Sequence, residues 1–229
     1  MLVYKAWRET RARFLISAAT LGWFCGAFVV LRPWIQYTAR RPFADAIIDS
    51  IYTGGVRNIF VMLVVAFGMG GLAQEQARGS AAFTLALPLS RDRLVFSRAG
   101  VGLLEVAALA LVPTAAVLGL APLTGESFGM GEAFLYSTQW AATGVVLFAV
   151  SFLTSVWLTG GPAAVTVTIL VIATYASILN VAALRAIPAL NVFALMDRPH
   201  PGADRLGGAV FVALVLIAAA ARATERQDF

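Results

Sequence analysis

The chain has 229 residues, of which 60% are hydrophobic and 13% charged, and a formal net charge of +5. Soluble domains usually carry about a quarter charged residues, so this composition excludes an ordinary soluble protein and indicates a polytopic membrane protein. Barrel strands would alternate in polarity, and the apolar runs of this chain do not. We therefore predict an all-α fold in a single transmembrane domain, residues 1–229.

Six apolar runs have about the length that a helix needs to cross a bilayer. The predicted spans are 14–31, 56–73, 94–118, 134–158, 162–184 and 206–221. The sequence shows no second domain, no low-complexity tract and no convincing internal repeat.

The chain opens with a basic stretch that superficially resembles a signal peptide. The apolar run that follows exceeds the usual ~7–15 residues, and no small-x-small cleavage site comes after it, so we predict an uncleaved first span. Before this span, Leu2 and Ala6 fall on one side of a helix, and Lys5, Arg8 and Arg11 lie near the other. This pattern favours a helix lying on the membrane surface, and a solvated basic tail is the alternative.

Small residues mark a possible contact in the first span. Gly22 and Gly26 form a G-x-x-x-G spacing, which lets membrane helices approach closely. Glycine is frequent in membrane helices, so a chance occurrence is the alternative. Cys25, beside this motif, is predicted to pack inside the protein.

Two connecting segments have the pattern of helices. Between the first two spans, apolar and acidic residues recur on different helical faces, which predicts a short amphipathic surface helix. The apolar members are Phe43, Ile47 and Ile51, and the acidic ones are Asp45 and Asp49. Before the sixth span, AIPALNVFALMDRPHPG is too short to cross the membrane and too apolar for a free loop, although a simple interfacial loop is the alternative.

A polar stretch, QEQARGSAAFTLALPLSRDR at 74–93, separates the second and third spans. Apolar residues recur at i, i+4 spacing in it, which predicts an amphipathic helix over 74–87. Pro88 ends this helix, because proline cannot donate a backbone hydrogen bond and disfavours helical geometry in the preceding residue. We expect a short helix along the cytoplasmic surface. The alternative is a loop that only solvates two helix ends.

Glu105 is the acidic residue that lies well inside a predicted span. A charge at the centre of a membrane helix costs roughly 2.5 to 3.5 kcal/mol on insertion scales, so we expect Glu105 to face the bundle, to pair or to be protonated. Arg98, seven residues earlier, lies on a similar helix face. Two interpretations stay open: Glu105 forms part of a transport path or gate, or it is a buried structural partner.

Basic residues predict the orientation. With the N-terminus inside, ten of the 17 Lys and Arg residues fall on the cytoplasmic side and seven on the outer side. Cytoplasmic loops carry an excess of these residues, so we predict a multi-pass protein of the cell membrane, in bacteria the inner membrane, with both termini cytoplasmic. Contact with anionic membrane lipid accounts for the net charge without any nucleic acid.

Several kinds of chemistry are excluded by residues that the chain lacks. Its one lysine is Lys5, so it holds no G-x-x-x-x-G-K-[ST] phosphate loop, and ATP-driven work would need a partner. One histidine, His200, and one cysteine allow neither a His/Cys metal cluster nor an internal disulfide. No histidine lies in a predicted span, which disfavours intramembrane hydrolysis by a serine–histidine pair. We predict that the chain is no enzyme and holds no catalytic residue, metal or cofactor.

The polar stretch also carries a family pattern. An acidic residue after the second span is followed by a glycine, an apolar run and a Pro-x-Ser-Arg turn. These are Glu75, Gly79, the run 81–87, and Pro88, Ser90 and Arg91. Together with six spans, the basic start and the charged ending ARATERQDF, they resemble the permease subunits of type-2 class ABC exporters, and the resemblance covers the whole chain.

The resemblance implies partners and a site. Residues 74–87 would be the coupling helix, which sits in a groove on a separate ATP-binding subunit that holds ATP and magnesium. The contact residues would be Glu75, Arg78, Gly79, Phe83, Arg91 and Arg93, with Gly79 allowing close approach of the backbones. The permease would work as a homodimer, or as a heterodimer with a related permease. Its first span would lie near the seam, which makes Gly22 and Gly26 candidates. The stretch 186–202 would form short outer re-entrant helices.

The expected function is export of a lipophilic or amphipathic substrate, since the spans offer mostly aliphatic side chains with a few Thr and Ser residues and Asn180. A haem-exporter-like permease is one alternative, with His200 as the lone candidate ligand, outside the spans. A membrane assembly or sensor protein that transports nothing is another. An adjacent gene for a P-loop ATPase would favour a transporter.

Overall fold

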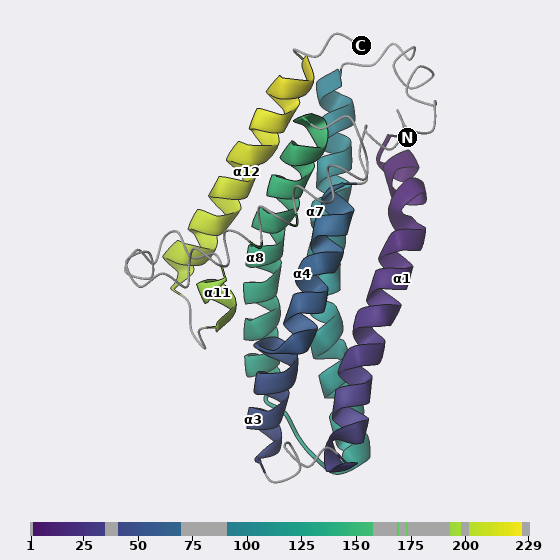
Figure 1. Ribbon diagram of the computed structural model, residues 1–229, viewed down its shortest axis with the longest axis vertical. Helices are drawn as coiled ribbons and strands as arrows, with labels where there is room; N and C mark the ends of the chain where they lie inside the picture. The colour runs from purple at the N-terminus through teal and green to yellow at the C-terminus, as the bar shows by residue number, and fades with distance from the viewer. Residues whose placement is uncertain are drawn as a thin grey trace.

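The computed structural model describes residues 2–34, 41–69, 91–157, 169, 173, 193–197 and 202–225. The predicted helical class is confirmed: 92% of these residues are helical, and none of them forms a strand. The long helices lie side by side in an elongated bundle, with both termini at the same end (Figure 1).

Five helical segments among the described residues are long and apolar enough to cross a membrane. They contain α1 (Leu2–Leu31), α3 (Phe43–Ile47) continued by α4 (Gly55–Gly68), α7 (Arg91–Leu120), α8 (Met130–Trp157) and α12 (Ala203–Glu225). Each overlaps one of the predicted spans, and the second begins earlier than predicted, at Phe43 and not at residue 56. The predicted span 162–184 lies almost wholly outside the described residues.

The N-terminal segment differs from the prediction of a separate helix on the membrane surface. α1 runs without a break from Leu2 to Leu31, so the basic residues occupy the first turns of the first span itself. The physical reason lies in its other face: Ala6 is buried and Thr10 is half-buried against the bundle, which holds these turns in line with the rest of the helix.

The amphipathic segment 43–51 is helical as predicted, and its apolar residues Phe43, Ile47 and Ile51 are buried while its acidic residues are exposed. It does not lie apart on a surface, because it continues through one π-helical turn, η2 (Ile48–Tyr52), towards α4. The Thr53 amide donates to the Ile48 carbonyl at 2.9 Å, which closes this wider turn.

Aromatic rings fill the bundle where η2 meets α8. The ring of Tyr52 stacks on Tyr136 with centroids 4.5 Å apart, and the ring of Trp140 lies 4.7 Å from that of Phe60. The Trp140 indole donates to the Tyr52 carbonyl at 3.2 Å. α8 thereby holds the middle of the bundle, where it contacts α4, α7 and α12.

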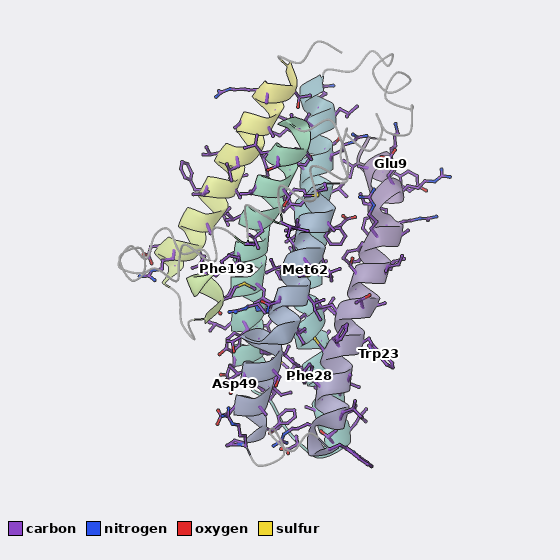
Figure 2. All side chains as sticks on the ribbon, viewed as in Figure 1. Glu9, Trp23, Phe28, Asp49, Met62 and Phe193 are labelled. Atoms are coloured by element: carbon purple, nitrogen blue, oxygen red, sulfur yellow. The ribbon has the colours of Figure 1, made fainter. Side chains whose placement is uncertain are left out.

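α1 and α12 flank this centre differently. α1 packs mainly against α7, and its outer face is open, with Trp23 76% exposed. α12 packs mainly against α8, and its N-terminal end lies beside the middle of α8 (Figure 1). The short helix α11 (Ala194–Asp197) also contacts α8 there, with Leu195 and Met196 buried. Phe193, just before α11, lies at the level of Met62 in the middle of α4 (Figure 2).

Candidate functional site: a polar cluster between α1 and α7

Glu105 lies on α7 and is buried, with 2% of its surface exposed. The Thr10 hydroxyl, which comes from α1, donates a hydrogen bond to the Glu105 carboxylate. The same hydroxyl lies 3.1 Å from the Ala6 carbonyl one turn earlier in α1. The structure therefore places Glu105 in the contact between the first and third predicted spans, facing the bundle as expected.

Charged side chains continue the contact towards the end of the bundle that carries the termini. Arg98 reaches Glu9 of α1 at 3.7 Å, and Lys5 lies 3.9 Å from the same carboxylate. Arg13, three residues after Thr10 on α1, is half-buried. Arg98 is largely shielded, with 13% of its side chain exposed, whereas Glu9 is 43% exposed. The result is one polar cluster that links α1 to α7 through opposite charges and a hydrogen bond.

A small pocket of about 30 Å³ adjoins this cluster. Its polar wall consists of Glu9, Thr10, Arg98 and Glu105, and its apolar wall of Ala6, Phe67, Val101, Gly102, Phe148 and Phe152. A water molecule needs about 10–15 Å³ by this measure, so the pocket has room for about two waters. Pockets for drug-sized ligands measure about 300–1,000 Å³. The pocket has room for water beside Glu105 but none for a drug-sized molecule.

The apolar wall is closely packed. A Cβ atom on Gly102 would lie 2.3 Å from the Phe148 ring, so only glycine lets this ring approach α7. Phe148 also stacks on Phe152, with centroids 5.7 Å apart. These contacts close the pocket from the side of α8.

A second group of charges lies at the opposite end of the bundle. Arg32 bonds to Glu126 at 2.6 Å and to the Arg41 carbonyl at 2.6 Å, and its guanidinium lies 5.1 Å from the centre of the Phe43 ring. Arg41 pairs with Asp49. These bonds tie the segment after α1 to the segment after α7, so this end is held by ion pairs.

The predicted contact residues for an ATP-binding subunit are described only in part. Glu75, Arg78, Gly79 and Phe83 lie outside the described residues. Arg91 is the first residue of α7, and Arg93, in the first turn, is exposed. Arg91, the first described residue of α7, comes three residues after Pro88 in the sequence and lies at the end of the bundle where α1 begins and α12 ends (Figure 1).

The two glycines of the first span face α7 of the same chain. A Cβ on Gly22 would lie 3.6 Å from Val112, and one on Gly26 would lie 3.1 Å from Leu120. Cys25, between them, is fully buried, as predicted. The G-x-x-x-G spacing thus brings α1 close to α7 of the same chain. A role of these glycines in a dimer seam stays a prediction.

Sequence reasoning found Glu105 and Arg98 but missed their α1 partners. The spacing of Ala6, Thr10 and Arg13, which places them on one helical face, could have predicted that this face of α1 packs against the bundle. It was overlooked because the first turns were assigned to the membrane surface and not to the bundle.

No protein-family model matches the chain, and no curated protein matches it either. The resemblance to exporter permeases therefore rests on the motifs of the chain itself.

Proposed function

We propose that the chain is the membrane-spanning subunit of an ATP-driven exporter of the type-2 ABC class, powered by a separate ATP-binding subunit. The cargo would be lipophilic or amphipathic. In this proposal, residues 74–93 receive the motion of the ATP-binding subunit, and α4 and α7 carry it into the bundle.

The observation that carries the proposal is the position of α7. It takes up the last residues of the polar stretch, 91–93, and continues as one helix of 30 residues, Arg91–Leu120, past Arg98 and Glu105. A displacement of its first turn would therefore reach the polar cluster with α1 through a single rigid element. The small pocket at that cluster fits a closed state, in which α1 and α7 have to separate before a substrate can pass.

Charge distribution supports a cytoplasmic position for the end with the termini. Among the described side chains, this end has seven basic and two acidic groups, and the opposite end has three basic and four acidic ones. The first set comprises Lys5, Arg8, Arg11, Arg13, Arg93, Arg98 and Arg222 with Glu9 and Glu105; the second comprises Arg32, Arg41 and Arg57 with Asp45, Asp49, Glu126 and Glu132. Excess positive charge is typical of the cytoplasmic side.

Assembly with a P-loop ATPase, expressed from a neighbouring gene, tests the proposal. We expect the two proteins to co-purify, and we expect Glu75→Lys and Phe83→Asp to reduce assembly or to uncouple ATP hydrolysis while the permease stays in the membrane. Matched controls at the opposite end are Glu132→Lys and Leu123→Asp, both at exposed positions, which should assemble normally.

The same experiment separates a transporter from an assembly or sensor protein. A sensor without an ATPase partner would show neither co-purification nor any difference between the two pairs of variants. Unchanged assembly and unchanged ATP hydrolysis in Glu75→Lys and Phe83→Asp would rule out the assigned coupling segment.

A further inference from the structure

We propose that the outer face of the first turns of α1 is a binding site for the headgroup of an anionic phospholipid. This inference concerns a different surface from the polar cluster, and it does not depend on the proposed transport function. Its evidence is the order of exposed side chains along one face of a helix.

One face of α1 carries Tyr4, Arg8, Arg11 and Leu15 at intervals of four, three and four residues, which places them in line. All four are exposed: Tyr4 is 70% exposed and Leu15 is 61% exposed. The opposite face holds Ala6 and Thr10 against the bundle, so the exposed face cannot be covered by α7. It presents an aromatic ring, two guanidinium groups and then an aliphatic side chain.

This order matches the layers of a membrane. After Arg13 the helix has no charged residue until Arg32, so 18 uncharged residues, 14–31, span about 27 Å. That length is close to the ~30 Å hydrocarbon core of a bilayer. With this segment in the hydrocarbon, Leu15 contacts acyl chains, Arg11 lies at the boundary and Arg8 lies one turn further out, among the phosphates. Tyr4 takes the interfacial position that tyrosine favours.

Charge favours an anionic headgroup over a neutral one. Arg8 and Arg11 form no ion pair with any acidic residue that the structure describes. The nearest acidic residue in the helix, Glu9, is already in contact with Arg98 and Lys5. Guanidinium groups bind phosphate oxygens through paired hydrogen bonds. Two of them, one turn apart and without an ion pair to the acidic residues of the described ranges, suit a lipid whose headgroup keeps a net negative charge, such as phosphatidylglycerol.

The test uses the full chain, purified without any ATPase and placed in lipid nanodiscs of phosphatidylcholine with or without phosphatidylglycerol. Two quantities are measured: the phosphatidylglycerol retained in native mass spectra and the shift in melting temperature that this lipid causes. Basic residues near an anionic surface contribute about 1 kcal/mol each, so Arg8→Gln with Arg11→Gln should weaken the apparent affinity about 30-fold. Arg8→Lys with Arg11→Lys keeps the charge and should retain most of the binding.

The matched control is Arg222→Gln, compared with Arg8→Gln alone; each removes one charge from an exposed position at the same end of the bundle, on α12 and on α1. We expect Arg222→Gln to keep the phosphatidylglycerol effect. An equal loss in these two variants would overturn the site, because it would show a general surface potential. The lipid site would also be overturned if the variant with Arg8→Gln and Arg11→Gln kept the full phosphatidylglycerol effect. That would hold even if this variant bound an acidic protein more weakly, because the two arginines would then serve a protein partner and not the lipid. If soluble glycerol phosphate displaced phosphatidylglycerol with the same affinity as the lipid itself, the site would bind free phosphate, and this result would overturn the lipid site as well.

Discussion

Buried polar side chains at the contact of α1 and α7 need partners inside the bundle, because burial takes them away from water. Glu105 accepts from Thr10, and Arg98 lies against Glu9, so each charge brought into α7 meets a group from α1. Removing the Thr10 hydroxyl would deprive the buried Glu105 carboxylate of this hydrogen bond, which costs about 1–3 kcal/mol.

Thr10→Val removes the hydroxyl with little change of shape and should lower the free energy of unfolding by about 1–3 kcal/mol. Glu105→Gln keeps an oxygen that can accept from Thr10, so we expect a smaller loss. Thermal unfolding in detergent of both single variants and the double variant measures the coupling. Thr138→Val, at an exposed threonine whose hydroxyl donates to the Phe134 carbonyl of its own helix, is the control and should have little effect.

The same variants separate the two interpretations of Glu105. If Glu105 belongs to a path or gate, Glu105→Gln changes transport or substrate-stimulated ATP hydrolysis while the protein stays folded. If it is a structural partner, function falls only in proportion to stability. Equal stability with a tenfold or greater loss of transport would exclude the purely structural role.

The packing of α8 against single glycines predicts opposite effects of two Gly→Ala substitutions. A Cβ on Gly68 would lie 2.4 Å from the Ser151 Cβ and 2.9 Å from the Phe148 carbonyl oxygen, and neither can move without the backbone of α8. Gly68→Ala should therefore destabilise the protein by about 1–3 kcal/mol. Gly100→Ala, in α7, meets nothing within 4 Å and should gain about 0.5–1 kcal/mol in stability, as helical Gly→Ala changes do. Equal melting temperatures for the two variants would contradict the packing of α4 against α8.

Single residues differ in how far the sequence could predict them. The cost of a charge in a membrane helix singles out Glu105, and helical spacing places Arg98 on its face. The role of Gly102 and Gly68 was not predictable, because their need for space comes from Phe148 and Ser151 on α8, more than 40 residues away. Such contacts depend on which helices are neighbours, and hydropathy carries no information about that.

α1 is the element whose environment changes most along its length. Its first turns carry charges that contact α7 on one face and lie open on the other, while its second half packs by small residues. Segment length and hydropathy identified the span but not the continuity of the helix, because the basic residues suggested a break where the structure has none.

A substitution at Gly26 tests whether this residue packs against α7 of the same chain. Gly26→Leu adds a side chain where a Cβ already lies 3.1 Å from Leu120, so it should force α1 away from α7 and lower the melting temperature of the isolated chain. The control is Gly119→Leu, because a Cβ atom on Gly119 would have no neighbouring atom within 4 Å among those compared. A variant that loses its dimer in size-exclusion chromatography but keeps its melting temperature would place Gly26 at a seam between copies instead.

The whole molecule presents two ends of different charge, which predicts its orientation. In a Cys25→Ser background, an impermeant maleimide should label Trp34→Cys on intact cells, because Trp34 is 84% exposed at the end opposite the termini. Val3→Cys, which is 58% exposed near the N-terminus, should react only after permeabilisation. Trp23→Cys, in the middle of α1, controls for access through lipid and should stay unlabelled in both cases. Labelling of Val3→Cys on intact cells would reverse the orientation.

In the proposed exporter, another protein's ATP hydrolysis enters this chain through residues 74–93. Its most direct test is a photo-reactive amino acid at Phe83, with the same group at Trp34 as a control at the opposite end. We expect the Phe83 probe to form a covalent adduct with an ATP-binding subunit, identified by its P-loop peptides, and the Trp34 probe to form none. A fully incorporated Phe83 probe that reacts only with lipid or with other parts of this chain would contradict it.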